Sequence, residues 1–249
     1  MLKSTGKEYL LPEKKETVLM IIRSAGAVFL LDIYFYRSVW ALIVLVPVGC
    51  AYFFLQKDLL EEKKRAVLRQ QFKELLMLSS TLQRAGYSVE NSILKSYRDL
   101  RYMYGKKAPV CRLVKEAGAA VGNKGSIGEV FIRTGLSAKI EEIEDFGRIY
   151  EIAYKKSGNM SLIMDKAAGS IMEKAEVENE IYVSVSKGRL EMRIMNLMPF
   201  FIMTYINLTG RGYFDVMYHN VPGITVMSIC LIIYILSYLW GIRIVSIRI

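Results

Sequence analysis

Two groups of acidic side chains are the residues most able to bind a partner. In one group the carboxylates fall together at the expected start of a helix, where the helix macrodipole favours negative charge. In the other group they recur at spacings of three and seven residues, which places them on one helix face. A solvated surface explains both groups, and docking of a partner protein by charge is the sharper alternative. The candidate docking residues are Glu141, Glu142, Glu144 and Asp145 in the first group, and Glu173, Glu176 and Glu180 in the second.

Residue sets that would support catalysis or metal binding are missing from the sequence. His219 is the single histidine, and no CxxC or HExxH motif accompanies it. The sequence therefore lacks the set of ligands that a zinc site needs and the histidine partner that a nucleophilic Ser or Cys needs. The glycine-rich segment GAAVGNKGS at 118–126 lacks the Lys-Ser/Thr pair that Walker A places directly after its second glycine. The three cysteines suit packing better than a disulfide framework. We therefore expect no enzyme activity, no metal and no cofactor.

The chain is basic and apolar at once, with a net charge of +10 and 53% hydrophobic residues. Most of its Lys and Arg residues lie between Lys57 and Arg193, together with most of the acids. By the positive-inside rule this block is cytoplasmic. The cluster Lys63-Lys64-Arg65 follows an apolar run, so we expect it at the anionic headgroups of membrane lipids. Nucleic-acid binding is not expected, because no aromatic residues alternate with these cations.

Four apolar runs could cross a membrane, which requires about 20 consecutive apolar residues for a helix. They occupy residues 18–36, 38–56, 194–210 and 221–242. We expect four spans, with both termini in the cytoplasm and two short external connections. The alternative is three spans with the first run as a buried helix. Either arrangement predicts a multi-pass protein of the plasma or inner membrane.

Polar residues inside the first and third runs need partners, because lipid offers none. In the first run, Arg23 and Asp32 lie near opposite ends, where each can reach an interface. In the third run, Asn196, Pro199 and Asn207 are expected to face protein neighbours. The same polar groups support an alternative function, a small multi-span transporter or channel, although no internal repeat of spans accompanies them.

The block between the two pairs of runs shows helical periodicity and no sustained alternation of period two. A first amphipathic helix is expected to end at Gly86, where a residue without a Cβ can adopt the left-handed cap geometry. Ser88 can then cap the next helix, whose apolar side carries Val89, Ile93 and Tyr104. The two helices predict an antiparallel hairpin that buries both apolar faces.

The second half of the block repeats this arrangement. A helix is expected to stop near Gly158, and a long helix follows from about Ser161. Because the long helix holds no proline before Pro199, it is expected to continue through Gly188 into the third apolar run. Such a helix would connect the bundle mechanically to the membrane segments.

The sequence thus predicts an all-α fold: a polytopic membrane protein with a cytoplasmic helical bundle between two pairs of transmembrane helices. The expected parts are a cytoplasmic N-terminal segment at 1–17, two transmembrane helices at 18–56, the bundle at 57–193, and two transmembrane helices with a short tail at 194–249.

Several stretches resemble the type II secretion F-domain family, in the branch of tight-adherence (Tad) pilus assembly platform proteins. They are QFKELLMLSSTLQRAGYSVENSI at 71–93, FGRIYEIAYKKSGNMSLIMDKAAGSI at 146–171 and KGRLEMRIMNLMPFFIMTYI at 187–206, followed by a last apolar run. The resemblance covers nearly the whole chain. One departure is Asn159, which stands where a second glycine is expected and which tolerates left-handed geometry better than most residues.

The resemblance implies a platform protein with a helical T2SSF-type cytoplasmic domain that hydrolyses nothing itself. Such platforms sit above a hexameric secretion ATPase and help to move pilin subunits from the membrane into a growing filament. The partners implied are that ATPase, pilin subunits, a paralogous platform protein and further copies in a homo- or hetero-oligomer.

Overall fold

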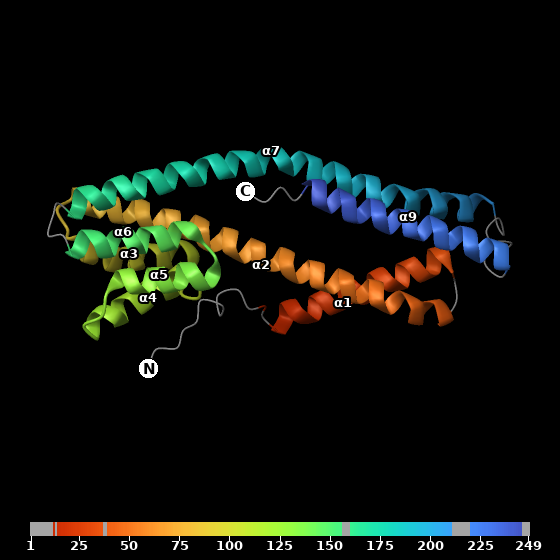
Figure 1. Cartoon of the computed structure of the whole chain (residues 1–249), viewed down its shortest axis with the longest axis horizontal. Coiled ribbons are helices and arrows are strands. Elements are labelled where there is room, and N and C mark those ends of the chain that lie inside the picture. Colours follow the sequence, from red (N-terminus) through yellow and green to blue (C-terminus); the bar gives the residue numbers. More distant parts are fainter. Residues whose placement is uncertain (1–11, 13, 37–38, 156–159, 211–219, 246–249) are drawn as a thin grey trace. The chain divides into compact units, whose positions relative to one another are not determined.

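The structure, a computed structural model, describes residue 12 and residues 14–36, 39–155, 160–210 and 220–245. These residues contain helices and no strand, as the predicted all-α class requires. The helices are α1 (Lys14–Phe35), α2 (Val39–Arg84), α3 (Val89–Tyr104), α4 (Pro109–Gly122), α5 (Ile127–Ala138), α6 (Glu141–Lys155), α7 (Met160–Thr209) and α9 (Val221–Val245) (Figure 1).

The chain divides into two compact units. Unit 1 comprises Met1–Pro12 and Asp58–Val177, and unit 2 comprises Glu13–Lys57 and Glu178–Ile249. Helices α2 and α7 therefore contribute residues to both units. Unit 1 ends on α7 earlier than the predicted bundle boundary at residue 193, because the α7 side chains that pack in its core are Ala168 and Ile171.

The core of unit 1 is built around three phenylalanines from three helices. Phe72 of α2, Phe131 of α5 and Phe146 of α6 meet edge to face, with ring centroids 5.6 to 5.8 Å apart. This geometry is the favoured one for aromatic pairs. The periodic apolar face of α2, which includes Leu68 and Leu75, is fully buried against them. The helical periodicity of the sequence therefore marks the face that builds the core.

Helices α5 and α6 approach closely through glycines. A Cβ added to Gly147 of α6 would lie 2.7 Å from the backbone nitrogen of Ile132 on α5. A Cβ on Gly128 of α5 would collide with Glu151 of α6 in the same way. The glycine-rich segment at 118–126 is the end of α4 and the turn before α5, two helices that periodicity alone did not reveal.

The turn between α2 and α3 confirms the predicted helix stop at Gly86 and the predicted cap at Ser88. Gly86 has a φ of +92°, which side chains with a Cβ adopt only with strain. Ser88 caps α3, and its side chain accepts a hydrogen bond from the Asn91 backbone nitrogen at 3.4 Å. Gly158, the corresponding stop before α7, lies outside the described residues.

Unit 2 joins its helices through both apolar and polar contacts. Its core contains Phe35 of α1, Leu45 of α2 and Leu231 of α9. Hydrogen bonds of 2.7 Å link the Tyr34 hydroxyl of α1 to Thr204 of α7, and the Tyr36 hydroxyl to Ser228 of α9. Many other apolar side chains of this unit are exposed; they include Phe201, Leu208, Ile233 and Trp240.

Two helices of the described chain are long and apolar enough to cross a membrane, namely Lys14–Phe35 and Pro222–Ile244. They correspond to the first and the last of the four predicted spans. The runs at 38–56 and 194–210 lie in α2 and α7, and their membrane crossing stays a prediction. Helix α7 is unbroken from Met160 to Thr209, so the predicted continuity through Gly188 is confirmed.

Candidate docking surfaces

The first acidic group lies on α6, but its four members have different surroundings. Glu142 is only 3% exposed, and its carboxylate oxygen Oε1 forms an ion pair with Arg69 Nε of α2 at 3.0 Å. Glu142 thus joins two helices of the core and is not accessible to a docking partner, which corrects its prediction as a docking residue. Glu144 pairs with Arg148 one turn later at 2.6 Å. Asp145 is exposed.

Glu141 connects the two acidic groups. Its side chain is 80% exposed and lies 3.5 Å from the Lys174 ammonium of α7. This ion pair brings the start of α6 beside the part of α7 that carries Glu173 and Glu176, both of which are exposed. Glu180 is also exposed on α7, although it belongs to unit 2. An exposed pair of this kind contributes at most about 1 kcal/mol, so these carboxylates stay available to a partner.

The predicted intramembrane residues fall into two groups in unit 2. Arg23 and Asn207 are exposed, whereas Asp32 is buried and Asn196 and Pro199 are half-buried. The Asn196 backbone oxygen accepts a hydrogen bond of 3.3 Å from the Tyr234 hydroxyl of α9.

A further surface, which the sequence reasoning missed, lies where α3 ends. Tyr102 is 94% exposed, Met103 is 53% exposed and Tyr104 is 36% exposed. Gly105 ends the helix with a φ of +84°. We call this surface the aromatic corner and define it by Arg98, Arg101, Tyr102, Met103, Tyr104, Lys106 and Lys107. All of its charged members are cations, and all four are exposed.

Tyr104 was expected on the apolar side of α3, and it lies at the edge of that side instead. Val89, Ile93 and Leu100 of the same helix are buried. Burial raises the pKa of the Tyr104 phenol above its usual range, and the nearby Glu74 carboxylate of α2 raises it further. The signal that could have revealed the corner is the sequence RYMYGKK itself, in which aromatic and basic residues gather at a glycine stop.

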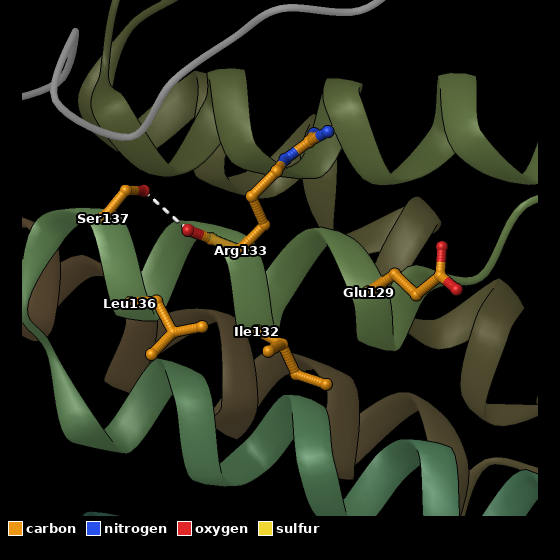
Figure 2. Close-up of a pocket in the computed structure, with 5 residues that line it drawn as sticks. All are labelled: Glu129, Ile132, Arg133, Leu136 and Ser137. Carbon is orange, nitrogen blue, oxygen red and sulfur yellow. Dashed lines mark hydrogen bonds between the residues drawn. The ribbon is translucent and has the colours of Figure 1, made fainter.

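A shallow groove runs along the outer side of α5 (Figure 2). Figure 2 shows Ile132 and Leu136 extending to one side of the helix and Arg133 to the other. The Ser137 hydroxyl donates to the Arg133 backbone oxygen at 2.6 Å, so it is held by its own helix. Glu129 completes the lining. These five side chains contain no nucleophile–base pair and no second carboxylate for acid–base chemistry.

Among the described residues, no group of three or more His, Cys, Asp or Glu side chains is placed to hold a metal ion. His219 lies outside the described residues.

Comparisons with protein-family models, with curated proteins and with solved structures yield no match to this chain.

Proposed function

We propose that the protein is a membrane platform of a tight-adherence pilus or of a type II secretion-like machine. In this function it couples a cytosolic hexameric secretion ATPase to the insertion of pilin into a filament. The support comes from the sequence motifs of residues 71–93, 146–171 and 187–206 and from the helical architecture that contains them.

The observation that carries the proposal is the course of α7. This helix has 50 residues and is therefore about 75 Å long at 1.5 Å per residue. It carries Glu173 and Glu176 in unit 1, and it continues into the apolar run at 194–210 in unit 2. A force applied to the first part of α7 would reach the predicted third span without crossing a loop.

The exposed carboxylates of α7 are the proposed contact for the ATPase. Glu173, Glu176 and Glu180 recur at three- and four-residue spacings, so they present negative charge along one side of the helix. A basic surface of the ATPase would associate with them faster and more specifically than a neutral one. Motion of the ATPase would then act directly on the helix that enters unit 2.

The proposal places unit 1 and the adjoining part of α7 that carries Glu180 in the cytoplasm. It places the apolar runs of unit 2 in the plasma or inner membrane, where pilin subunits and a paralogous platform protein would contact them. The high share of Lys and Arg in the sequence of unit 1 supports this orientation. The exposed apolar surface of unit 2, which includes Phe201 and Trp240, would face lipid or those partners.

The test is site-specific photo-crosslinking in cells that contain the whole secretion machine. A photoreactive amino acid at Glu176 is expected to capture the hexameric ATPase, identified by mass spectrometry. The E173K/E176K variant, with the photoreactive group at Glu180, is expected to lose most of this capture, whereas Glu129→Lys, a single charge reversal on α5, serves as a control. Absence of the ATPase among the captured proteins, although it is present in the same cells, would overturn the proposed function.

A further inference from the structure

The aromatic corner has the composition of a protein interface. Tyrosine, methionine and arginine are enriched at the buried centres of interfaces and carry much of their binding energy. Tyr102 contacts almost nothing in its own chain, since 94% of it is exposed. Asp99 is the one acidic residue between Arg98 and Lys107, and it pairs with Arg98 at 3.7 Å. The corner therefore suits a partner with a negatively charged surface.

The chain itself carries such a surface on the exposed side of α6. Glu141 and Asp145 are four positions apart, so they project from the same side of the helix. Glu142, their buried neighbour, pairs with Arg69 and so fixes this part of α6 at the level of Arg69 on α2.

The aromatic corner lies at almost the same level on α2. Directly after the corner, the Val110 backbone nitrogen donates to the Gln71 side chain at 3.2 Å. Tyr104 of the corner lies close enough to Glu74 for that carboxylate to act on its phenol. Arg69 and Gln71 are two positions apart, which is about 200° of rotation around an α-helix. The corner and the α6 carboxylates thus lie on opposite flanks of α2 at one level.

Lipid headgroups are the other source of negative charge. The corner has the composition of a protein interface, and the chain offers Glu141 and Asp145 as an exposed surface of opposite charge. A second copy is therefore the partner that fits the corner, and a crosslink to lipid is the outcome that would speak against it.

We propose that the aromatic corner of one copy docks on Glu141 and Asp145 of a second copy. Copies in one membrane share the direction of α2, so two surfaces at one level on opposite flanks can meet by lateral packing. The contact is heterologous, because the two copies use different surfaces, and repetition closes it into a ring with cyclic symmetry or extends it into a row.

This inference requires that the copies share one membrane orientation, and it is independent of the ATPase contact. A photoreactive group at Glu180 reports the ATPase contact, and one at Tyr102 reports the contact between copies. A negative result at one position therefore leaves the other contact measurable.

The experiment uses the full chain in its native membrane with a photoreactive amino acid at Tyr102. The expected product is a crosslinked pair of chains in which the Tyr102 position is joined to a peptide containing Glu141 and Asp145. A crosslink to lipid, to the ATPase or to another region of a second copy would overturn the proposal, as would the absence of a crosslinked pair.

Charge reversal then tests the pairing itself. Reversal of the corner by R101E/K106E, or of the α6 surface by E141K/D145K, is expected to reduce the crosslinked pair about tenfold, because like charges then face each other. Lys166→Glu, a single charge reversal at an exposed position of α7, is the control and is expected to leave the yield unchanged. Co-expression of the two reversed chains is expected to restore the crosslink, since each corner again meets a surface of opposite charge. Failure of this rescue in well-folded, membrane-inserted chains would overturn the proposal.

Discussion

Unit 1 encloses a large apolar core, whereas the buried core of unit 2 is small and many of its large apolar side chains stay on the surface. Phe72, Phe131 and Phe146 of unit 1 are at most 2% exposed, but Phe201 of unit 2 is 67% exposed. Both helices that are long and apolar enough to span a membrane carry exposed apolar side chains, for example Phe29 of α1 and Ile233 of α9. The contrast is the one expected when water surrounds unit 1 and hydrocarbon surrounds much of unit 2, as the proposed function requires.

The forces between helices differ accordingly. In unit 1 the helices are joined by burial of apolar surface and by close glycine contacts. In unit 2, hydroxyl groups of Tyr34 and Tyr36 bridge between helices. In the membrane location proposed for unit 2, lipid would remove most of the hydrophobic driving force between helices, so packing and hydrogen bonds would carry a larger share there. Substitutions that delete the same group in both units test this difference.

The largest expected effect is the loss of a core phenylalanine. Phe131→Ala should destabilise unit 1 by about 3–5 kcal/mol, because it removes apolar contacts and leaves a cavity. Phe201→Ala in unit 2 should change stability far less, since that ring is mostly exposed. The buried Cys111 thiol of α4 is a reporter of unit 1, because it becomes accessible to a water-soluble maleimide only when the unit opens. Similar Cys111 labelling of the two variants in urea would contradict the comparison.

A single methyl group should have a smaller effect that again depends on the unit. Gly147→Ala should cost unit 1 about 1–3 kcal/mol, because its Cβ meets the α5 backbone. Gly26→Ala in unit 2 has open space around the new Cβ and should be neutral or stabilising by up to about 1 kcal/mol. Thermal unfolding of the purified chain in detergent, combined with hydrogen exchange by segment, measures both. Equal losses of stability in the two variants would show that the close glycine contact between α5 and α6 is not the cause of the effect at Gly147.

Unit 1 should lose stability at alkaline pH through Tyr150. Burial raises the pKa of its phenol far above the ordinary value of 10.0, and the Glu90 carboxylate, which accepts its hydrogen bond at 3.2 Å, raises it further. The folded state thus holds the proton more tightly than the unfolded state. The stabilisation is complete below about pH 10 and falls above it by up to about 1.4 kcal/mol per pH unit.

Urea unfolding at pH 8 and at pH 11, followed by circular dichroism, measures this loss. Tyr150→Phe is expected to be less stable at pH 8, since the Glu90 contact is gone, and to lose less between the two pH values. Tyr102→Phe is the matched control, because its phenol is exposed. If Tyr150→Phe lost as much unfolding free energy between pH 8 and pH 11 as the unmodified chain does, other groups would be the cause of the loss.

The smallest expected effect concerns the hydrogen bonds of unit 2. Tyr34→Phe removes the contact to Thr204, and interhelical hydrogen bonds in membranes contribute about 0.6 kcal/mol on average. The thermal midpoint in detergent should therefore fall only slightly, with faster hydrogen exchange in α1 and the second half of α7. A loss as large as that of Phe131→Ala would mean that hydroxyl contacts dominate unit 2.

The parts of the fold that follow from local sequence were predictable. The stop at Gly86, the cap at Ser88 and the buried face around Leu75 depend on a glycine, a hydroxyl group and a helical repeat, all of which act within a few residues. The length of α7 was also predictable, because no proline interrupts it before Pro199 and helix propensity is a local property. Helices α4 and α5 were missed, because their glycines serve contacts to distant residues.

The candidate surfaces were only partly predictable for the same reason. Glu141 and Glu142 are neighbours in the sequence, yet one is exposed beside Lys174 and the other is buried beside Arg69. The aromatic corner likewise depends on how far the core extends along α3, which leaves Leu100 buried and Tyr102 exposed. Sequence spacing identifies helix faces, but it does not identify which face finds a partner.

The sequence by itself determined the helices other than α4 and α5, their main stops, the apolar runs and the basic character of the central block. These depend on backbone preferences and on hydrophobicity, which act over one to five turns of helix. Only the tertiary structure decided which acids are free to bind, which glycines are contact points and where an aromatic surface stays uncovered. The reason is physical: burial and charge pairing depend on residues that lie far away in the sequence and meet only when the helices pack.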